Sequence, residues 1–480
     1  MAFILNLFKS KPVPPERVPT DTIIPLNSHD DNHVMRAIAL QFSMRFDDVL
    51  DAEKLAGALQ RLLERPGWRR MGARLRLNDQ GKLEYHVPQE YTKERPSVDY
   101  THAIHDMPAA SHPIARRLPR SNNTLFLGPV SDDFRPLVNP PRVCTELKDW
   151  IYQDSPQLQL HIVSFHDTTL VTLSWLHTLL DALGRNALLR AWVQVLEGRD
   201  EEVPDFYAYD FDPLATLGDP PSTESAKQTA EPYLLHDKRM STWQMLKFGF
   251  NFMWEMYFYP LEQQRVLCIP STFFKKLHAE ALSDLQHADP SLLTLSTTTH
   301  TPFLSEGDVL GAWFTRLILQ NQPWTPTSPP KKTIHFSNVF GMRDILTSTS
   351  PPLLERGKAY IGNCANSISS FFTLHEFLTL PLGHIAARIR ADLVLQASRA
   401  QIEAKSRITR QNGGNMVLYG DADMCLVTLS NWTKAKLFET DFSAAVVREG
   451  KERHARGRPS YIHADGRANG FSLRNAECAA

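Results

Sequence analysis

The chain has 480 residues, of which 42% are hydrophobic and 22% charged, so it can bury a large core and is long enough for two or three lobes. Its formal net charge is -1, and the absence of a basic excess argues against a nucleic-acid partner. The five cysteines lie far apart and include no Cys-x-x-Cys pair, which favours neither a zinc site nor a disulfide framework and fits a reducing compartment such as the cytoplasm.

The first part of the chain has the patterns of a mixed sheet covered by helices. Residues Arg36 to Phe46 alternate like a strand, and Asp51 to Glu64 has four leucines on one side of a helix. Trp68 to Val87 predicts two short strands around the turn at Asn78 to Gly81. Val98 to Pro141 is rich in turn residues and predicts loop with short strand.

The stretch from Gln157 to Glu197 combines a hairpin with a helix. Apolar residues alternate up to the turn at His166-Asp167, and a second apolar run ends at Trp175. Apolar positions then recur at helical spacing from Leu179 until Gly198 ends the pattern. His177 is therefore expected where a buried strand turns into a helix, a position that fixes the backbone and leaves the ring one open side.

A linker and a second lobe follow. Glu201 to Pro232 is rich in Pro, Asp, Ser and Thr, which indicates a crossover between lobes. Ser305 to Asp308 is a capping-box pattern in front of an apolar helix, and Lys332 to Phe340 predicts a strand. We therefore expect an α/β protein with mixed sheets, divided into a lobe over 1-200, a linker over 201-240 and a lobe over 241-480.

Residues Met245 to Pro260 form the most apolar run of the chain, rich in Phe, Met, Trp and Tyr. Lys247 and Glu255 interrupt it, and it is shorter than a membrane span. We interpret it as a buried or pocket-lining helix in preference to a helix on a membrane surface.

Catalytic motifs of other enzyme classes are missing from the sequence. It has no Gly-x-Ser-x-Gly elbow, no His-Glu-x-x-His, no P-loop and no dinucleotide fingerprint. His177 and Asp181 form a His-x-x-x-Asp pattern, which is weak alone, since one of 18 histidines is more often a hydrogen-bonded structural residue than a base.

Further segments in order along the chain strengthen the pattern. The chain resembles the BAHD acyltransferases, particularly their fungal relatives of trichothecene-acetyltransferase type, through the segments 24-31, His177 to Gly184, Ser305 to Trp313, Asn338 to Arg343, Tyr360 to Asn363, Ser430 to Trp432 and Asp441 to Ser443. The resemblance implies two chloramphenicol-acetyltransferase-like lobes joined by a crossover, with a central channel. His177 would lie midway along it, with acyl-coenzyme A entering from one face and the acceptor from the other.

The resemblance also implies a role for each site residue. His177 would be the general base that takes the proton of an acceptor hydroxyl, and Ser430 and Trp432 would stabilise the oxyanion. Asp181 would turn away from the ring and pair with Arg343, so that its role is structural, as is that of Asp441. The implied reaction is transfer of an acyl group, by default acetyl, from acyl-CoA to a hydroxyl of a small secondary metabolite. We expect a monomer with no permanent cofactor and no metal, and we do not expect contact with a membrane.

The sequence departs from the family pattern in two places that matter. The family's Asp-Phe-Gly-Trp-Gly motif reads Asp441-Phe442-Ser443-Ala444-Ala445, so a turn that needs positive φ must be made differently. The chain ends at Arg474 to Ala480, where relatives continue into a further strand, which predicts an unpaired sheet edge.

Other functions stay open. A catalytically degenerate relative would have a binding role, and an amine acceptor would give an amide with the same base. Condensation domains of peptide synthetases are disfavoured, because Leu176 stands where they have a second histidine and the chain has no carrier module.

Overall fold

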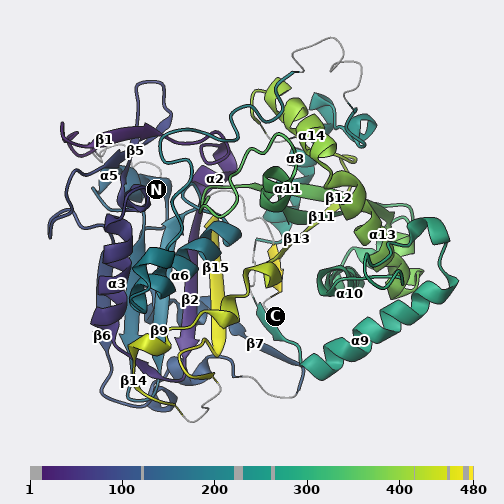
Figure 1. Ribbon diagram of the computed structural model, residues 1–480. Helices are drawn as coiled ribbons and strands as arrows, with labels where there is room; N and C mark the ends of the chain where they lie inside the picture. Colours follow the sequence, from purple (N-terminus) through teal and green to yellow (C-terminus); the bar gives the residue numbers. More distant parts are fainter. Residues whose placement is uncertain are drawn as a thin grey trace, which may run out of the picture.

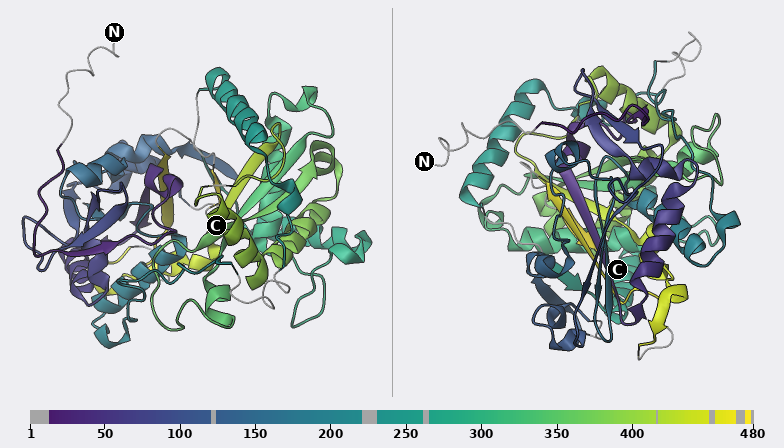
Figure 2. Two further views of the ribbon diagram at one scale, coloured as in Figure 1. Left: turned by 90° about the horizontal axis from the view of Figure 1, so that it is seen from above. Right: turned by 90° about the vertical axis from the view of Figure 1, so that its left-hand side faces the viewer.

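A computed structural model describes residues 13-120, 124-220, 231-260, 265-415, 417-450, 455-468 and 475-478. Two halves, each built on its own sheet, lie side by side (Figures 1 and 2). We call them the first half, which holds most of the N-terminal chain, and the second half, which holds most of the C-terminal chain. The predicted α/β class with mixed sheets is confirmed.

The first half is organised around a five-stranded sheet in which only the β6-β8 pair is parallel. Strands β8 and β9 form the predicted hairpin, and every residue of β9, which lies between β2 and β8 in the sheet, is buried. The sheet order is β15 (Tyr461–Ala468), β2 (Ile38–Phe46), β9 (Thr169–Leu176), β8 (Gln159–Ser164) and β6 (Asp99–Ile104).

Helices α3 (Ala52–Glu64) and α6 (Ala182–Leu196) pack against each other over this sheet. Asp51 caps α3 through the backbone N–H of Lys54, and the indole N–H of Trp192 in α6 donates to the carbonyl of Leu55 at 2.9 Å. Three short helices surround them: α2 (His33–Ala37), α4 (Arg135–Val138) and α5 (Leu147–Tyr152). A three-stranded sheet has the order β1 (Thr22–Pro25), β5 (Leu83–Val87) and β4 (Arg74–Leu77). Two further strand pairs are β10 (Arg265–Cys268) with β7 (Phe126–Val130), and β14 (Val446–Arg448) with β3 (Val49–Leu50).

The second half is built on a four-stranded sheet. Its order is β12 (Ala365–Thr373), β11 (Thr333–Gly341), β13 (Cys425–Asn431) and β16 (Asn475–Cys478). Ile334, Phe336 and Leu429 point from it into a core with the helices. The helices of this half are α9 (Ser271–Asp284), α10 (Glu306–Asn321), α11 (Arg343–Ser348), α12 (Leu374–Thr379), α13 (Leu382–Gln396) and α14 (Arg399–Gln411).

Sheet pairing crosses the predicted division of the chain. Strand β15 lies far beyond residue 241 but pairs with β2 in the first half, and β10 pairs with β7. The last described segment, β16, pairs in parallel with β13 from Thr428 to Asn431 and is the outermost strand of its sheet, so the expected unpaired edge stays a prediction. The boundaries at 200 and 240 stay a prediction. Strands β10, β14 and β15 follow residue 240 in the chain but pair with strands of the first half.

The altered motif at Asp441 makes its turn without a glycine of its own. Residues Ser443–Ala445 form a 3-10 turn whose flanking residues have negative φ, as expected for a chain without the two glycines. A glycine from another segment, Gly457, packs against this turn with a φ of 68°. Only glycine fits there, since a Cβ at residue 457 would lie 2.2 Å from the backbone nitrogen of Ser443.

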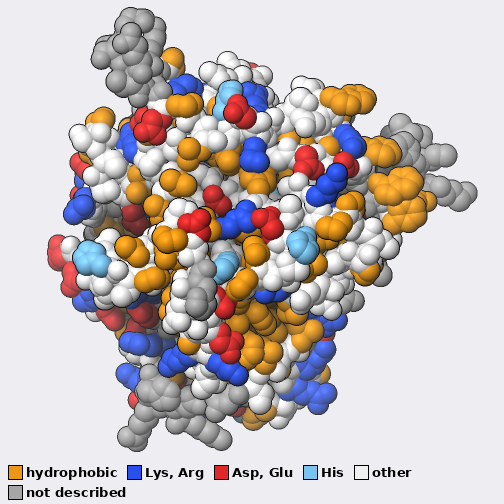
Figure 3. All heavy atoms as spheres, turned by 90° about the vertical axis from the view of Figure 1, so that its right-hand side faces the viewer, with side chains coloured by type: hydrophobic (Ala, Val, Ile, Leu, Met, Phe, Trp, Pro, Cys, Tyr) orange, Lys and Arg blue, Asp and Glu red, His pale blue; other side chains and the backbone are white. Residues whose placement is uncertain are grey.

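The apolar run in α8 (Thr242–Phe258) corrects an expectation. It forms a helix with a capping box, but none of its residues is buried, so the predicted buried or pocket-lining helix is wrong. No helix in the part of the chain that the structure describes is both long and apolar enough to cross a membrane. On the side of the molecule that the second half forms, charged side chains of both signs are interspersed with hydrophobic ones (Figure 3).

Candidate active site

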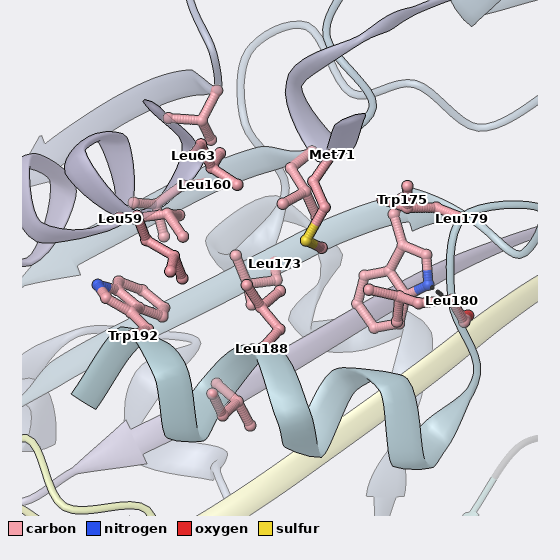
Figure 4. Close-up of a cluster of buried hydrophobic side chains, with 14 of the residues drawn as sticks. Leu59, Leu63, Met71, Leu160, Leu173, Trp175, Leu179, Leu180, Leu188 and Trp192 are labelled. Atoms are coloured by element: carbon pink, nitrogen blue, oxygen red, sulfur yellow. Dashed lines mark hydrogen bonds between the residues drawn. The ribbon is translucent and has the colours of Figure 1, made fainter. Parts of the chain in front are cut away.

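The backbone of His177 is fixed on both sides. Strand β9 ends at Leu176, and the His177 N–H donates to the carbonyl of Ile38 at 2.8 Å. The turn that follows is held in the core by buried leucines and by the indole of Trp175, which donates to the carbonyl of Leu180 at 3.2 Å (Figure 4). A buried strand and a packed turn therefore position the imidazole, as the sequence pattern predicts.

One ring nitrogen of His177 is enclosed by the protein. The residue is half-buried, and its Nδ1 is buried without a hydrogen-bond partner among the described residues. Burial lowers the pKa of His177 from its usual 6.5, with a smaller contribution in the same direction from Arg185, while its own backbone, Asp181 and Asn363 oppose the shift. A lowered pKa favours the neutral imidazole at neutral pH, the form that can accept a proton.

Asp181 has both carboxylate oxygens engaged away from that ring. Its Oδ1 caps α6 by accepting from the N–H groups of Leu183 and Gly184 at 3.1 and 2.9 Å. Its Oδ2 accepts from Arg343 Nη1 at 2.8 Å and from the Cys364 N–H at 2.9 Å. Burial opposes ionisation, but Arg343 and the N–H donors outweigh it and hold the pKa of Asp181 below its usual value. The expected Asp181–Arg343 pair is present, and within the described residues no hydrogen bond joins Asp181 to His177.

Arg343 connects the two halves at this point. Besides Asp181, its guanidinium donates to the carbonyls of Tyr360 and Gly362 at 3.2 and 2.5 Å. The start of α6 approaches the same loop so closely that a Cβ at Gly184 would lie 2.0 Å from the carbonyl oxygen of Ile361. Glycine at 184 is therefore required for this contact.

Asp30 and Asn363 support the His177 turn, and sequence reasoning gave them no role. Asn363 Nδ2 donates to the carbonyl of His177 at 2.8 Å and to Asp30 Oδ1 at 2.8 Å, and the Asn363 N–H donates to the same Oδ1 at 2.7 Å. Burial raises the pKa of Asp30 to about 7, against the opposing effect of Asn363. Both residues lie in segments that carry the family resemblance, but a loop Asp and a loop Asn 333 positions apart show no pattern that links them.

Ser430 and Trp432 stand together at the end of β13. The Trp432 Nε1–H donates to Ser430 Oγ at 2.9 Å, so the indole N–H is committed to the serine, whose own O–H is left to donate elsewhere. The Trp432 ring lies 4.4 Å from the guanidinium carbon of Arg185, which also lies 4.0 Å over the ring of Phe42. Arg185 is one turn into α6, so these contacts join Ser430 and Trp432 to the helix that follows His177.

Asp441 lies elsewhere. Its Oδ1 accepts from the Ser443 N–H at 2.9 Å, and its Oδ2 is 3.6 Å from Arg458. The neighbouring Phe442 packs on Trp192, ten residues into α6 and so about 15 Å along the helix from its start. The structure does not bring Asp441 to His177, and its structural role stays a prediction.

Over the described ranges, no group of three or more His, Cys, Asp or Glu residues is arranged to hold a metal ion.

Known proteins resemble the chain over nearly its whole length. No protein-family model matches it. It is 38% identical to "Transcriptional regulator calD" of Penicillium decumbens, covering 98% of this chain and 92% of the relative. It is 36% identical to "Acetyltransferase sphE" of Aspergillus fumigatus, covering 98% and 91%.

Solved structures share the fold. The structure of TRI101 from F. sporotrichioides complexed with coenzyme A and T-2 matches with a TM-score of 0.59 at 15% identity, covering 92% of this chain and 88% of that one. The structure of vinorine synthase matches with a TM-score of 0.53 at 13% identity, covering 94% and 86%.

Proposed function

The chain belongs to the fungal BAHD-type acyltransferases, whose co-substrate is an acyl-coenzyme A, and we propose that it acylates a hydroxyl of a small secondary metabolite with His177 as general base. The default donor is acetyl-CoA, since relatives at 36% identity are named acetyltransferases. Donor and acceptor would meet at Nε2 of His177 in a ternary complex.

The proposed step is a direct transfer. Nε2 of neutral His177 takes the proton of the acceptor hydroxyl while its oxygen attacks the thioester carbonyl carbon. The new C–O bond gives a tetrahedral oxyanion, the C–S bond then breaks, and the proton on His177 passes to the departing thiolate. The products are an ester and free coenzyme A, so no other reactant is needed.

The observation that carries this proposal is how His177 is held. Its backbone N–H and carbonyl are both hydrogen-bonded, its Nδ1 is enclosed, and the residue as a whole is half-buried. A base held in this way needs no rearrangement before it accepts a proton. The test is release of free thiol from acetyl-CoA by the purified chain with a panel of hydroxylated terpenoids and polyketides, confirmed by the mass of the acylated product.

Ser430 is proposed as the direct oxyanion donor, with Trp432 acting through it. Ser430→Ala is expected to lower kcat by about 10²- to 10³-fold, because a hydroxyl aimed at developing negative charge is lost. Ser430→Thr keeps the hydroxyl and should restore most of the rate. Trp432→Phe removes the N–H that orients Ser430 and should have a smaller effect. Equal kcat values for the alanine and threonine variants would contradict the assignment.

The pH dependence follows from the lowered pKa of His177. A base with a lowered pKa stays neutral, and so active, to a more acidic pH, and its activity is lost only as the pH falls through that value. We therefore expect kcat/KM to hold its plateau at neutral pH and to fall with a midpoint below 6.5. The measurement is kcat/KM against pH, with product quantified chromatographically. The Asp30 carboxyl also titrates near pH 7, so the same pH profile is measured for Asp30→Asn, which lacks that carboxyl. A midpoint above 7 in both the wild type and Asp30→Asn would refute the assignment of the profile to His177.

A non-catalytic role is the second candidate, because a relative at 38% identity is named a transcriptional regulator. The two candidates differ in one measurement. If no donor and acceptor pair gives product, while coenzyme A or a metabolite still binds in calorimetry, the binding role is supported. Product formation that depends on His177 supports the enzyme.

A further inference from the structure

Helix α8 presents an apolar face to solvent. It begins at a complete capping box, in which Gln244 N–H donates to Ser241 Oγ at 3.3 Å and Ser241 N–H donates to Gln244 Oε1 at 2.8 Å. None of its 17 residues is buried. Large side chains on this face recur every three or four residues and are 54 to 79% exposed: Trp243, Leu246, Phe250, Met253, Trp254, Tyr257 and Phe258. Soluble proteins seldom expose so contiguous an apolar group without a binding function.

Contacts on the opposite side of α8, and at the edge of its apolar face where Lys247 lies, fix the orientation of the helix. Asn251 Nδ2 donates to the carbonyl of Ala422 at 2.9 Å and to Asp423 Oδ1 at 3.0 Å, and Lys247 pairs with Asp423 at 2.8 Å. Met245 and Phe248 pack against a small buried cluster of the second half. The helix is thus docked on the protein by one side, and its outward face is set by these contacts.

The exposed rings also contact one another. The Trp254 ring centroid lies 6.1 Å from that of Phe250 and 4.8 Å from that of Phe258, so three aromatic side chains one turn apart form a row. This row is ordered before any partner arrives, which reduces the entropy lost on binding.

The chemistry of the face favours lipid. Its charged residue, Lys247, is already paired with Asp423, and Glu255 lies on the half-buried side, so the face offers no charge pattern for a complementary protein. Tryptophan and tyrosine with apolar neighbours are the residues that settle at the boundary between lipid headgroups and acyl chains. We propose that α8 is an in-plane anchor that seats the protein on a lipid bilayer, with its aromatic row inserted at that boundary.

Because the face lacks a basic excess, insertion of apolar side chains would supply the affinity. Binding should occur on vesicles of phosphatidylcholine alone, with little gain from added phosphatidylserine and little loss in high salt. A strong requirement for phosphatidylserine would instead indicate recognition of an anionic headgroup and would overturn the proposed mode.

The test is co-sedimentation of the full chain with phosphatidylcholine vesicles. The variant Phe250→Ser/Trp254→Ser removes the centre of the row and is expected to lower partitioning about tenfold, with an unchanged unfolding temperature because both side chains are exposed. Val394→Ser/Leu395→Ser, at exposed apolar positions of α13, is the matched control and should bind like the wild type. The assay needs no turnover, so it is independent of the proposed acyl transfer.

Two outcomes would overturn the proposal. One is a wild-type chain that does not sediment with vesicles, or a double variant that sediments equally well. The other is a wild-type chain that is dimeric by light scattering and becomes monomeric in Phe250→Ser/Trp254→Ser, which would make α8 a contact between copies.

Discussion

His177→Ala is expected to lower kcat by about 10²- to 10⁴-fold while the protein stays folded. Without the imidazole, no base takes the proton of the acceptor hydroxyl as its oxygen attacks the thioester. The remaining rate comes from substrate positioning and the oxyanion donor. The fold should survive, because the two hydrogen bonds at residue 177 are made by its backbone N–H and carbonyl, and alanine keeps both.

The measurement is thiol release at saturating acetyl-CoA, with the unfolding temperature of each protein recorded in parallel. His102→Ala is the matched control: His102 is also half-buried, burial also lowers its pKa, and it lies on β6 at the edge of the five-stranded sheet. It should turn over like the wild type. A fully active His177→Ala would remove the imidazole from the mechanism.

Local patterns predicted the elements that carry the catalytic candidates. The alternation that ends at Trp175 and the helical spacing after it place His177 between β9 and α6, as the structure shows. The capping box at Ser305 also formed, with Asp308 accepting from the N-cap N–H. These features depend on residues within a few positions of each other, so they can be predicted from the local sequence.

Local sequence patterns did not predict the contacts between segments that lie far apart in the chain. Asp30 and Asn363 meet because two loops 333 positions apart in the chain converge under His177, and neither loop has a repeating pattern. Strand β15 pairs with β2 across more than 400 residues, although its sequence fits a strand in either half equally well. Topology decides such pairings, and the division of the chain at residue 240 could not anticipate them.

The prediction that α8 is buried failed for a different reason. Composition shows that a helix is apolar but does not show whether the protein has a surface to cover it. A rule that places apolar residues inside works in one direction only, since much of any folded surface is apolar as well. The informative observation is the contiguous exposed face, which only the structure reveals.

Asp181→Asn is expected to lower the free energy of unfolding by about 3–5 kcal/mol and to lower activity with it. An asparagine can still cap α6 through its Oδ1, but its NH₂ group would face Arg343 and the Cys364 N–H, two donors that now share the carboxylate oxygen Oδ2. The buried guanidinium would then have lost its counter-charge, and the contact between α6 and the 360-364 loop would loosen.

Stability and activity should fall together here because the same carboxylate holds the helix that follows His177. Asp48→Asn is the matched control: Asp48 is also buried, and its oxygens accept from the N–H groups of Gly450 and Gly457 at 2.6 and 2.7 Å, away from the His177 turn. It should lower stability in urea unfolding but leave kcat per folded molecule unchanged. If Asp181→Asn behaved like Asp48→Asn, or kept both properties, Asp181 would not be what positions the catalytic turn, and the reason for its pairing with Arg343 would have to be sought in folding alone.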